Sequence, residues 1–422
     1  MRKFILALLT MVLPACAGGP SHVTGPTSRN PGHPYRWGGT ISYHTDQGGL
    51  GNQTNAQANS MVAGAFLVWQ NVGTASLDVQ NQGQLPFDVT AENVMAFQNS
   101  LGRCSDSGHP QNSIVYDVDG TILAALGMDN NSVLGFAGII CTDDSAGLYT
   151  RGWSVLNGRF IDGQPNAPGH QSISLQSYRA ALIHEFGHLI GLGHSQVNVK
   201  CLTDSFCRPE ELAGVPVMFP VLVDRSGIEL TVDDRASLSL LYPDPAFSTT
   251  TSRIQGQVVF SDGVTPAQGY NVIARQVVDP ARTAVSSVSG FLFTAGTGNP
   301  LMPDGSDTNL FFGSRDTNLI GFYDIAGLPP GDYTVEVEAI NSSGQFPFVG
   351  SRGVGPVGES LGFQFKMPGR CRVQYLHPPS TPDDDCAARS ILTLRAGELL
   401  NTGTDVVLLG TPERYDQWED GP

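Results

Sequence analysis

The sequence predicts an α+β domain followed by an all-β domain. Residues 35–243 mix short strand-like segments with three windows in which apolar side chains recur at helical spacing. Residues 253–410 show strand patterns separated by Gly, Pro and Asp turns, and no window of helical period stands out. The length of 422 residues suffices for domains that each bury a core of their own.

The composition is strongly acidic. The chain has 39 acidic and 23 basic side chains, a formal net charge of −16 and a pI near 4.8. Such a chain is repelled by phosphate backbones, which argues against nucleic acid as its partner.

The N-terminus has the pattern of an export signal. Arg2 and Lys3 precede an apolar run over residues 4–13, which is too short to span a bilayer. Ala15-Cys16-Ala17 fits an ordinary signal peptidase site, whereas residues 13–16 resemble a bacterial lipobox in which Cys16 becomes lipidated. Residues 1–17 are therefore expected to be a bacterial-type signal peptide. The mature protein is either secreted or a cell-envelope lipoprotein, and a lipid on Cys16 is its only expected membrane contact.

Without Cys16, six cysteines remain. An even number of cysteines in an exported chain favours disulfides. Their order suggests three local pairs among fifteen possible connectivities. These pairs are Cys104–Cys141, Cys201–Cys207 and Cys371–Cys386.

Residues 18–34 are rich in Gly, Pro, Ser and Thr and predict a flexible tether. The elements expected in the first domain are strands at 40–43, 113–118 and 133–140, and helices at 55–72, 175–192 and 231–241. The last helix starts with Thr231 and Asp234, an [ST]-x-x-[DE] pattern that is typical of a capping box.

The second domain begins after a linker expected at 244–252. Strands are expected at 254–260, 270–275, 332–340 and 405–409. Residues 332–340 alternate, with Tyr333 and Val335 on one face and Glu336 and Glu338 on the other, which predicts a half-buried strand. Residues 411–422 form an acidic tail with a solvated end.

One stretch of the first domain contains candidate metal ligands and a candidate catalytic residue. His184 and His188 are four residues apart, so on a helix both imidazoles project from one face and can bind one ion. Glu185 lies about 100° around the helix, where it can hold a water as general base without ligating the metal. Gly191 allows the helix to stop and the chain to turn back.

That turn delivers His194 as a third nitrogen ligand. Three protein ligands leave a fourth tetrahedral position open, which distinguishes a catalytic zinc site from a structural one. A chance match to the whole H-E-x-x-H-x-x-G-x-x-H pattern has a probability on the order of 10⁻⁵ for this composition. The pattern therefore predicts one catalytic Zn²⁺.

Residues 184–194, followed by Ser195, resemble the extended zinc signature of the metzincin proteases, and most closely that of the matrixin (matrix metalloproteinase-type) branch. Residues 217–220 resemble the Met-turn of the family, whose methionine, here Met218, lies beneath the zinc ligands. Residues 230–242 are similar to the matrixin C-terminal helix. The resemblance implies a zincin-like fold over 35–243, with a twisted mixed sheet and three helices.

The chain also departs from the family pattern. No cysteine motif that could block the zinc precedes the domain, so latency through a cysteine switch is not expected. Cys201 and Cys207 lie in an unusually long segment between His194 and Met218. By resemblance, residues 133–140 are a candidate edge strand for an extended substrate, and a plain buried strand is the alternative.

Calcium is a further candidate ligand. Asp117 and Asp119 precede Gly120 in an Asp-rich turn, and hard carboxylate oxygens suit Ca²⁺. An ordinary Asp-Gly turn is the alternative. In the second domain, residues 321–335 and 254–258 resemble the carboxypeptidase-regulatory-like (prealbumin-like) β-sandwich, which indicates a fold but no activity.

The resemblance implies a zinc metalloendopeptidase that acts on polypeptides, with Glu185 as general base. The signal pattern adds export, and we expect a monomer. Two alternatives stay open: a surface binding or adhesion protein that uses the metzincin domain as a scaffold, and a zinc amidase that acts on cell-wall substrates. The intact Glu185 argues against the scaffold.

Overall fold

The computed structural model describes residues 19–22, 24, 29, 33–195, 197–198, 209–219, 222, 228–267, 270–289, 321–339, 373–378 and 385–409. The expected signal peptide (1–17) and acidic tail (411–422) lie outside the described residues. So do four of the cysteines, Cys16, Cys201, Cys207 and Cys371. No helix in the described part is both long and apolar enough to cross a bilayer.

The N-terminal lobe is built on a mixed sheet with strand order β1-β6-β4-β2-β3 and with β5 beside β6. All its pairings are parallel except that of β5 with β6, which is antiparallel. Among the described strands β5 pairs with β6 alone, so it forms an edge. The strands are β1 (Arg36–Trp37), β2 (Ile41–Thr45), β3 (Val79–Gln84), β4 (Asn112–Asp117), β5 (Gly135–Asp143) and β6 (Leu148–Asn157).

Helices cover both faces of this sheet. Ile114 and Tyr116 of β4 belong to one core with α1 (Asn55–Gln70) and α4 (Leu175–Ile190), where Phe66 and Phe186 stack with ring centroids 4.1 Å apart. Val115 points the other way, into a second core beneath α2 (Val94–Leu101) and α3 (Thr121–Ala125). The alternation along β4 therefore separates the two cores. A short 3₁₀ helix, η1 (Gly158–Ile161), follows β6.

The helices and strands predicted in this lobe correspond to α1, α4, α7 (Val232–Leu241), β2, β4 and β5. Capping explains the starts of the helices. Thr54 forms a capping box with Gln57 before α1, and Thr231 forms one with Asp234 before α7.

The prediction of a flexible tether at 18–34 is wrong for its described residues. The amide of Ser21 donates to the carbonyl of Gly191 at 2.8 Å, and the amide of Gly193 donates to the carbonyl of Gly19 at 2.8 Å. His22 lies beside Tyr149, and its burial lowers its imidazole pKa to about 4. The Gly, Pro and Ser content predicts flexibility, but pairing with the 191–193 turn holds residues 19–21 in place.

The segment predicted as a linker, 244–252, contains regular structure. Residues Pro245–Thr250 form helix α8, and Ser252 already begins β7. Asp244 caps the helix by accepting from the amide of Ala246 at 2.9 Å, and Pro245 occupies its first turn. An Asp-Pro pair is typical of a helix start, because the Asp side chain can cap the helix and Pro is tolerated in its first turn.

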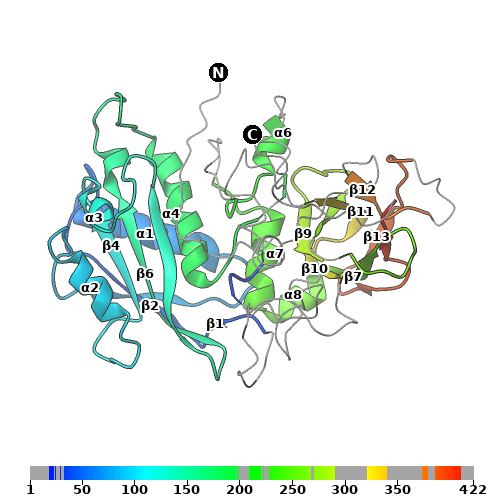
Figure 1. The fold of residues 1–422 in the computed structure, drawn as a ribbon, viewed down its shortest axis with the longest axis horizontal. Helices are drawn as coiled ribbons and strands as arrows, with labels where there is room; N and C mark the ends of the chain where they lie inside the picture. The colour runs from blue at the N-terminus through cyan, green and yellow to red at the C-terminus, as the bar shows by residue number, and fades with distance from the viewer. Residues whose placement is uncertain are drawn as a thin grey trace, which may run out of the picture.

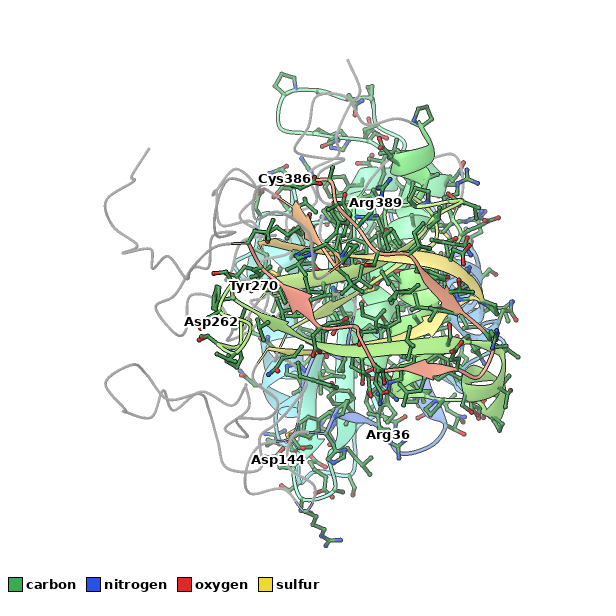
Figure 2. The ribbon with its side chains drawn as sticks, turned by 90° about the vertical axis from the view of Figure 1, so that its right-hand side faces the viewer. Arg36, Asp144, Asp262, Tyr270, Cys386 and Arg389 are labelled. Carbon is green, nitrogen blue, oxygen red and sulfur yellow. A yellow bond between two sulfur atoms is a disulfide. The ribbon has the colours of Figure 1, made fainter. Side chains whose placement is uncertain are left out.

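The C-terminal lobe consists of two sheets around one core. The first has the order β10-β7-β14, with β15 also on β7, and the second has the order β12-β11-β8-β9, with β13 also on β11. Figure 2 views this lobe, with Tyr270 at the start of β8 labelled. The strands are β7 (Ser252–Val259), β8 (Tyr270–Gln276), β9 (Ala284–Val288), β10 (Phe322–Leu328), β11 (Gly331–Ala339), β12 (Val373–Tyr375), β13 (Leu392–Leu394), β14 (Leu399–Leu400) and β15 (Val406–Val407).

Helix α7 lies between the two lobes (Figure 1). Its Leu238 and Leu241 belong to the core of the N-terminal lobe, whereas Val232 and Ala236 belong to the core of the β-sheets. Gly327 of β10 packs so closely on α7 that a Cβ there would lie 2.5 Å from that of Ala236. One helix therefore contributes to both cores.

Strand β11 is not half-buried as predicted. Its apolar face, with Tyr333 and Val335, lies in the core, but Glu336 and Glu338 are only 6% and 7% exposed. Arg275 forms an ion pair with Glu336, and Asn271 donates to Glu338 at 3.0 Å. The polar face of this sheet is therefore covered, which alternation within one strand cannot reveal.

Candidate metal centre

Helix α4 places two of the three predicted ligands. The hydroxyl of Ser174 caps its start by accepting from the amide of Ser177 at 3.0 Å. The helix then runs without interruption through His184, Glu185 and His188, all of which are buried. The spacing of four residues brings the two imidazoles to the same face, as predicted.

Gly191 ends the helix with a left-handed backbone, at φ +113°. The amide of Leu192 donates back to the carbonyl of Gly187 at 2.9 Å, which is the bonding pattern of a Schellman cap. A Cβ on Gly191 would lie 2.7 Å from the ring of Tyr149, so both conformation and space require glycine here. This turn brings His194 back to the helix.

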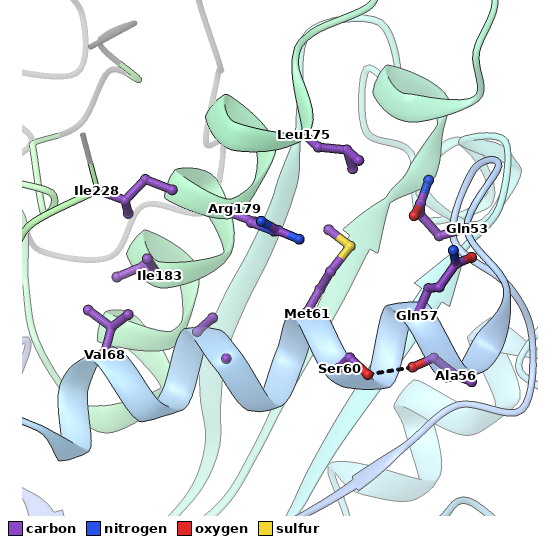
Figure 3. Close-up of a pocket in the computed structure, with 12 residues that line it drawn as sticks. Gln53, Ala56, Gln57, Ser60, Met61, Val68, Leu175, Arg179, Ile183 and Ile228 are labelled. Carbon is purple, nitrogen blue, oxygen red and sulfur yellow. Dashed lines mark hydrogen bonds between the residues drawn. The ribbon is translucent and has the colours of Figure 1, made fainter. Parts of the chain in front are cut away.

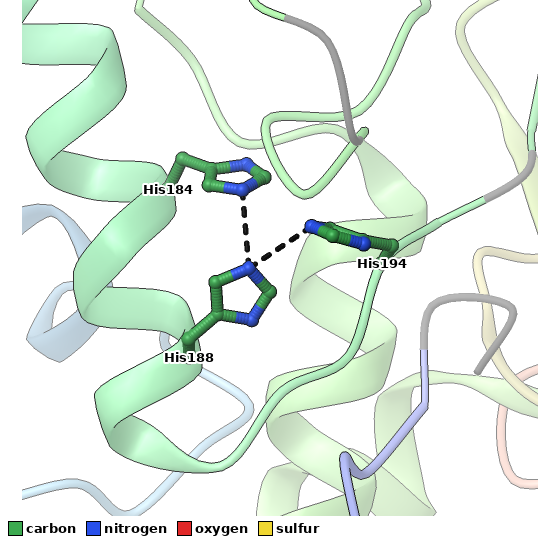
Figure 4. A group of neighbouring side chains, drawn as sticks. All are labelled: His184, His188 and His194. Carbon is green, nitrogen blue, oxygen red and sulfur yellow. Dashed lines mark hydrogen bonds between the residues drawn. The ribbon is translucent and has the colours of Figure 1, made fainter. Parts of the chain in front are cut away.

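The three histidines converge (Figure 4). The Nε2 atom of His188 lies 3.1 Å from the Nε2 atoms of both His184 and His194. Two nitrogens about 2.0 Å from one tetrahedral zinc ion lie about 3.3 Å apart. The spacing of the imidazoles therefore fits a single ion of this size, and they are the one such group among the described residues.

The second ring nitrogens explain why these Nε2 atoms can act as ligands. The Nδ1–H of His184 donates to the carbonyl of Val217 at 2.7 Å, and that of His188 donates to the carbonyl of Leu192 at 2.8 Å. With Nδ1 protonated, each neutral ring has a lone pair on Nε2. Lone pairs that face one another at 3.1 Å repel unless a cation lies between them, so the donor set fits a bound metal.

Burial also favours the neutral, ligating form of the three imidazoles. It lowers the pKa of His184, lowers that of His188 to about 3, and lowers that of His194 well below its ordinary value. The physical cause is the loss of solvent around a charged ring.

Glu185 lies beside this cluster and is 3% exposed. Its carboxylate accepts a hydrogen bond from the amide of Ala137 on the edge strand β5, and its Oε2 has no hydrogen-bond partner. Burial raises its pKa well above the ordinary range. A buried carboxylate with one oxygen positioned and one available is suited to accept and release a proton.

Met218 lies directly under α4. A Cβ on Gly187 would come within 2.2 Å of the Met218 sulfur, so the helix must have glycine between its two ligands. Asp234 accepts from the amides of Val217 and Met218 at 2.9 and 3.0 Å and thereby connects this turn to α7. The amide of Ser195 donates to the carbonyl of Met218 at 2.8 Å. The turn thus supports both His184 and the segment after His194.

The structure gives the predicted calcium residues another role. The Asp117 carboxylate accepts from the amides of Gly120, Ile122 and Leu123 at 2.8–3.1 Å. Asp119 accepts from the amide and hydroxyl of Thr121. Both carboxylates stabilise the start of α3, so the turn alternative accounts for them and we do not propose calcium here.

Cys104 and Cys141 form a disulfide, as their order suggested. The bond connects the end of the α2 region to β5. Cys386, labelled in Figure 2, is disulfide-bonded as well. The other cysteines of the suggested pairs lie outside the described residues.

Two participants were not predicted as site residues. Asp233 accepts from the hydroxyl of Ser195 at 2.6 Å, and the N-terminal residues 19–22 lie along the 191–193 turn. The signal for Asp233 was its place beside Asp234 in the predicted capping box, a pattern in which only Asp234 of the two acids takes part. No pattern in residues 19–22 indicates their partner.

A groove of about 740 Å³ runs between α1 and α4 (Figure 3). Met61, Val68, Leu175, Arg179 and Ile183 are among its lining residues, and none of the three histidines is. The groove lies on a different face of α4 from the metal centre.

Comparisons with known proteins leave the family of this chain open. No protein-family model matches the sequence, and no curated protein matches it. Among solved structures, the chain is similar to a leucine-rich repeat protein from Bacteroides thetaiotaomicron VPI-5482, with a TM-score of 0.15 and 12% identity. That match covers 40% of this chain and 14% of the other chain, and at this TM-score it carries no argument about fold or function.

Proposed function

We propose that this protein is an exported zinc-dependent endopeptidase of the metzincin type, most similar to the matrixin branch. The observation that carries the proposal is the convergence of His184, His188 and His194 on one point, with the unpartnered Oε2 of Glu185 in the same buried site. A structural zinc site has no need of a buried carboxylate base. The disulfide between Cys104 and Cys141 supports export, because such bonds persist in oxidising compartments.

The three imidazoles would hold one Zn²⁺, which supplies a Lewis acid that polarises the scissile carbonyl and makes water more acidic. Glu185 accepts the proton of the attacking water at its carboxylate and passes it to the departing amine nitrogen. Burial raises its pKa, which makes the carboxylate a stronger base toward that proton. The amide of Ala137 holds the carboxylate during both transfers.

The position of strand β5 is an argument for a polypeptide as the substrate. It forms a sheet edge among the described strands, and its Ala137 directly contacts Glu185. An extended peptide that adds to this edge would pass beside the base and the histidines. This arrangement favours an endopeptidase, since an edge strand can align a chain on both sides of the cleaved bond.

The Glu185→Ala variant tests the assignment. We expect it to retain stoichiometric zinc, because the three imidazoles are intact, and to lose peptidase activity by at least about a hundredfold, the range of general-base catalysis. Zinc is quantified on the purified protein, and activity is measured on a peptide library with and without a chelator. The control is Glu229→Ala, an acid outside the site.

Full cleavage by Glu185→Ala would contradict the assignment. Zinc binding without cleavage by the wild type would favour a scaffold, and hydrolysis confined to cell-wall amides would favour an amidase.

A further inference from the structure

The segment after the third histidine lies against the C-terminal lobe. Val197 is 1% exposed and forms a small apolar cluster with Ile273 of β8 and Ala284 of β9. Ile273 is the outward-facing neighbour of Val272, which points into the core of the β-sheets. The N-terminal lobe therefore places an apolar side chain of this segment on the outer face of the second sheet.

Asn198 adds polar contacts at the same place. Its side-chain amide donates to the carbonyls of Gly214 and Ala281, both at 2.8 Å, and its oxygen accepts from Arg275 at 2.6 Å. Asn198 has φ +64°, a backbone conformation that asparagine tolerates better than most residues. A Cβ on Gly214 would lie 1.9 Å from the carbonyl oxygen of Ala281, which shows how closely the chains approach.

A third contact passes through Asp233 of α7. One oxygen of its carboxylate accepts from the hydroxyl of Ser195 at 2.6 Å, and the other accepts from the amide of Ser286 on β9 at 2.9 Å. The carboxylate is fully buried. It thus joins the residue next to His194 directly to the C-terminal lobe.

These contacts matter because the three ligands are held differently. His184 and His188 are positioned by the hydrogen bonds of α4, whereas His194 stands outside the helix. The position of His194 therefore depends on the turn that precedes it and on the contacts of the segment that follows it. The described contacts after His194, apart from those with Met218 and Gly214, are with α7, with β8 and β9, and with Ala281 in the loop between these two strands.

We propose that strands β8 and β9 position His194 for metal binding by holding Ser195, Val197 and Asn198. The C-terminal lobe is then part of the metal centre rather than an independent appended module. Ile273, Val197 and Asn198 are positioning residues, since they act through the chain that leads to His194. The inference rests on the proposed function and deepens it.

The test compares Ile273→Ala with Val272→Ala in the full chain. Both changes shorten a buried side chain of β8, but only Ile273 faces Val197. Asn198→Gly is a second variant that keeps the left-handed backbone, removes the side-chain contacts and leaves the sheets intact. Three properties are measured: Zn²⁺ affinity by chelator competition, the visible absorption of the Co²⁺-substituted protein, and amide exchange of residues 193–198 in metal-free protein.

We expect Ile273→Ala and Asn198→Gly to weaken Zn²⁺ binding roughly tenfold, as other supporting changes around metal ligands do. Both should shift the Co²⁺ absorption and speed exchange at Ser195 and Val197. Val272→Ala should lower thermal stability and leave all three properties as in the wild type. Unchanged affinity, absorption and exchange in both positioning variants would overturn the inference.

A wild-type chain that binds no Zn²⁺ would instead overturn the proposed function. In that case the exchange of residues 193–198 decides by itself whether β8 and β9 hold the segment.

Discussion

At the scale of single residues, the metal centre depends on a few positions where only one side chain fits. Gly187 lies between two ligands because Met218 occupies the space of a Cβ, and Gly191 adopts a left-handed backbone against Tyr149. The Nε2 atoms of His184 and His188 are available as candidate ligands because backbone carbonyls bind the Nδ1 atoms of both rings. Small residues and backbone groups thus determine the geometry of the imidazoles.

The Gly187→Ala variant tests this packing. The added methyl would overlap the Met218 sulfur in a buried site, so we expect a loss of about 1–3 kcal/mol in the free energy of unfolding. The control is Gly64→Ala on α1, where no atom lies within 4 Å of the new Cβ. That change should stabilise the chain by about 0.5–1 kcal/mol. Urea unfolding measures both, and equal effects of the two changes would argue against close packing at Gly187.

At the scale of elements, β5 combines several roles. Among the described strands it is an edge of the sheet, it contributes the amide that holds Glu185, and its Cys141 is bonded to Cys104. Edge strands lack a partner on one side and open more easily than central strands. The disulfide therefore anchors the strand that lies beside the proposed base.

Replacing Cys104 and Cys141 by serine tests the role of this anchor. The bond closes a loop with a sequence separation of 37, and removing it should lower the free energy of unfolding by about 2–4 kcal/mol. Amide exchange along β5 should become faster, whereas exchange along β4 should change only with global stability. Denaturant unfolding and exchange measured by mass spectrometry check both effects. Unchanged exchange in β5 would show that β6 alone holds the strand.

At the scale of the whole molecule, buried carboxylates connect distant segments. Asp233 and Asp234 of α7 connect the turn at Val217 and Met218, the segment after His194 and β9. Asp46 accepts from the amides of Val89 and Tyr116 at 3.0 Å and thus connects β2, β4 and the loop after β3. Asp46 and Asp233 lose solvent on folding, which raises the pKa of both carboxyl groups, so the stability of the chain depends on pH.

Asp46 makes the stability of the folded chain fall as the pH rises. Burial raises its pKa from 3.8 to about 7. Between these pH values the folded state binds more protons than the unfolded state. The contribution of Asp46 to the free energy of unfolding is therefore full below about pH 4 and declines as the pH rises to about 7. The decline amounts to at most about 4 kcal/mol.

The Asp46→Asn variant isolates this contribution. Its stability should depend less steeply on pH between about 4 and 7 than that of the wild type, because residue 46 no longer titrates. Denaturant unfolding of both proteins at several pH values checks the slopes. Parallel slopes would show that other groups cause the dependence.

The sequence predicted the elements that local patterns specify. Periodicity located α1 and α4, and the [ST]-x-x-[DE] pattern located the start of α7. It failed where a local pattern has two interpretations. Asp244 and Pro245 begin a short helix inside the expected linker, and Glu336 and Glu338 are covered instead of solvated.

The sequence by itself determined the identity and spacing of the candidate ligands and of the base, because helical geometry converts a spacing of four residues into one shared face. Only the tertiary structure decided which groups bind the other ring nitrogens, which strand holds Glu185, and what the chain after His194 packs against. These contacts join residues that lie far apart in the chain. Local periodicity describes which face of an element is apolar, and it contains no information about which distant segment covers that face.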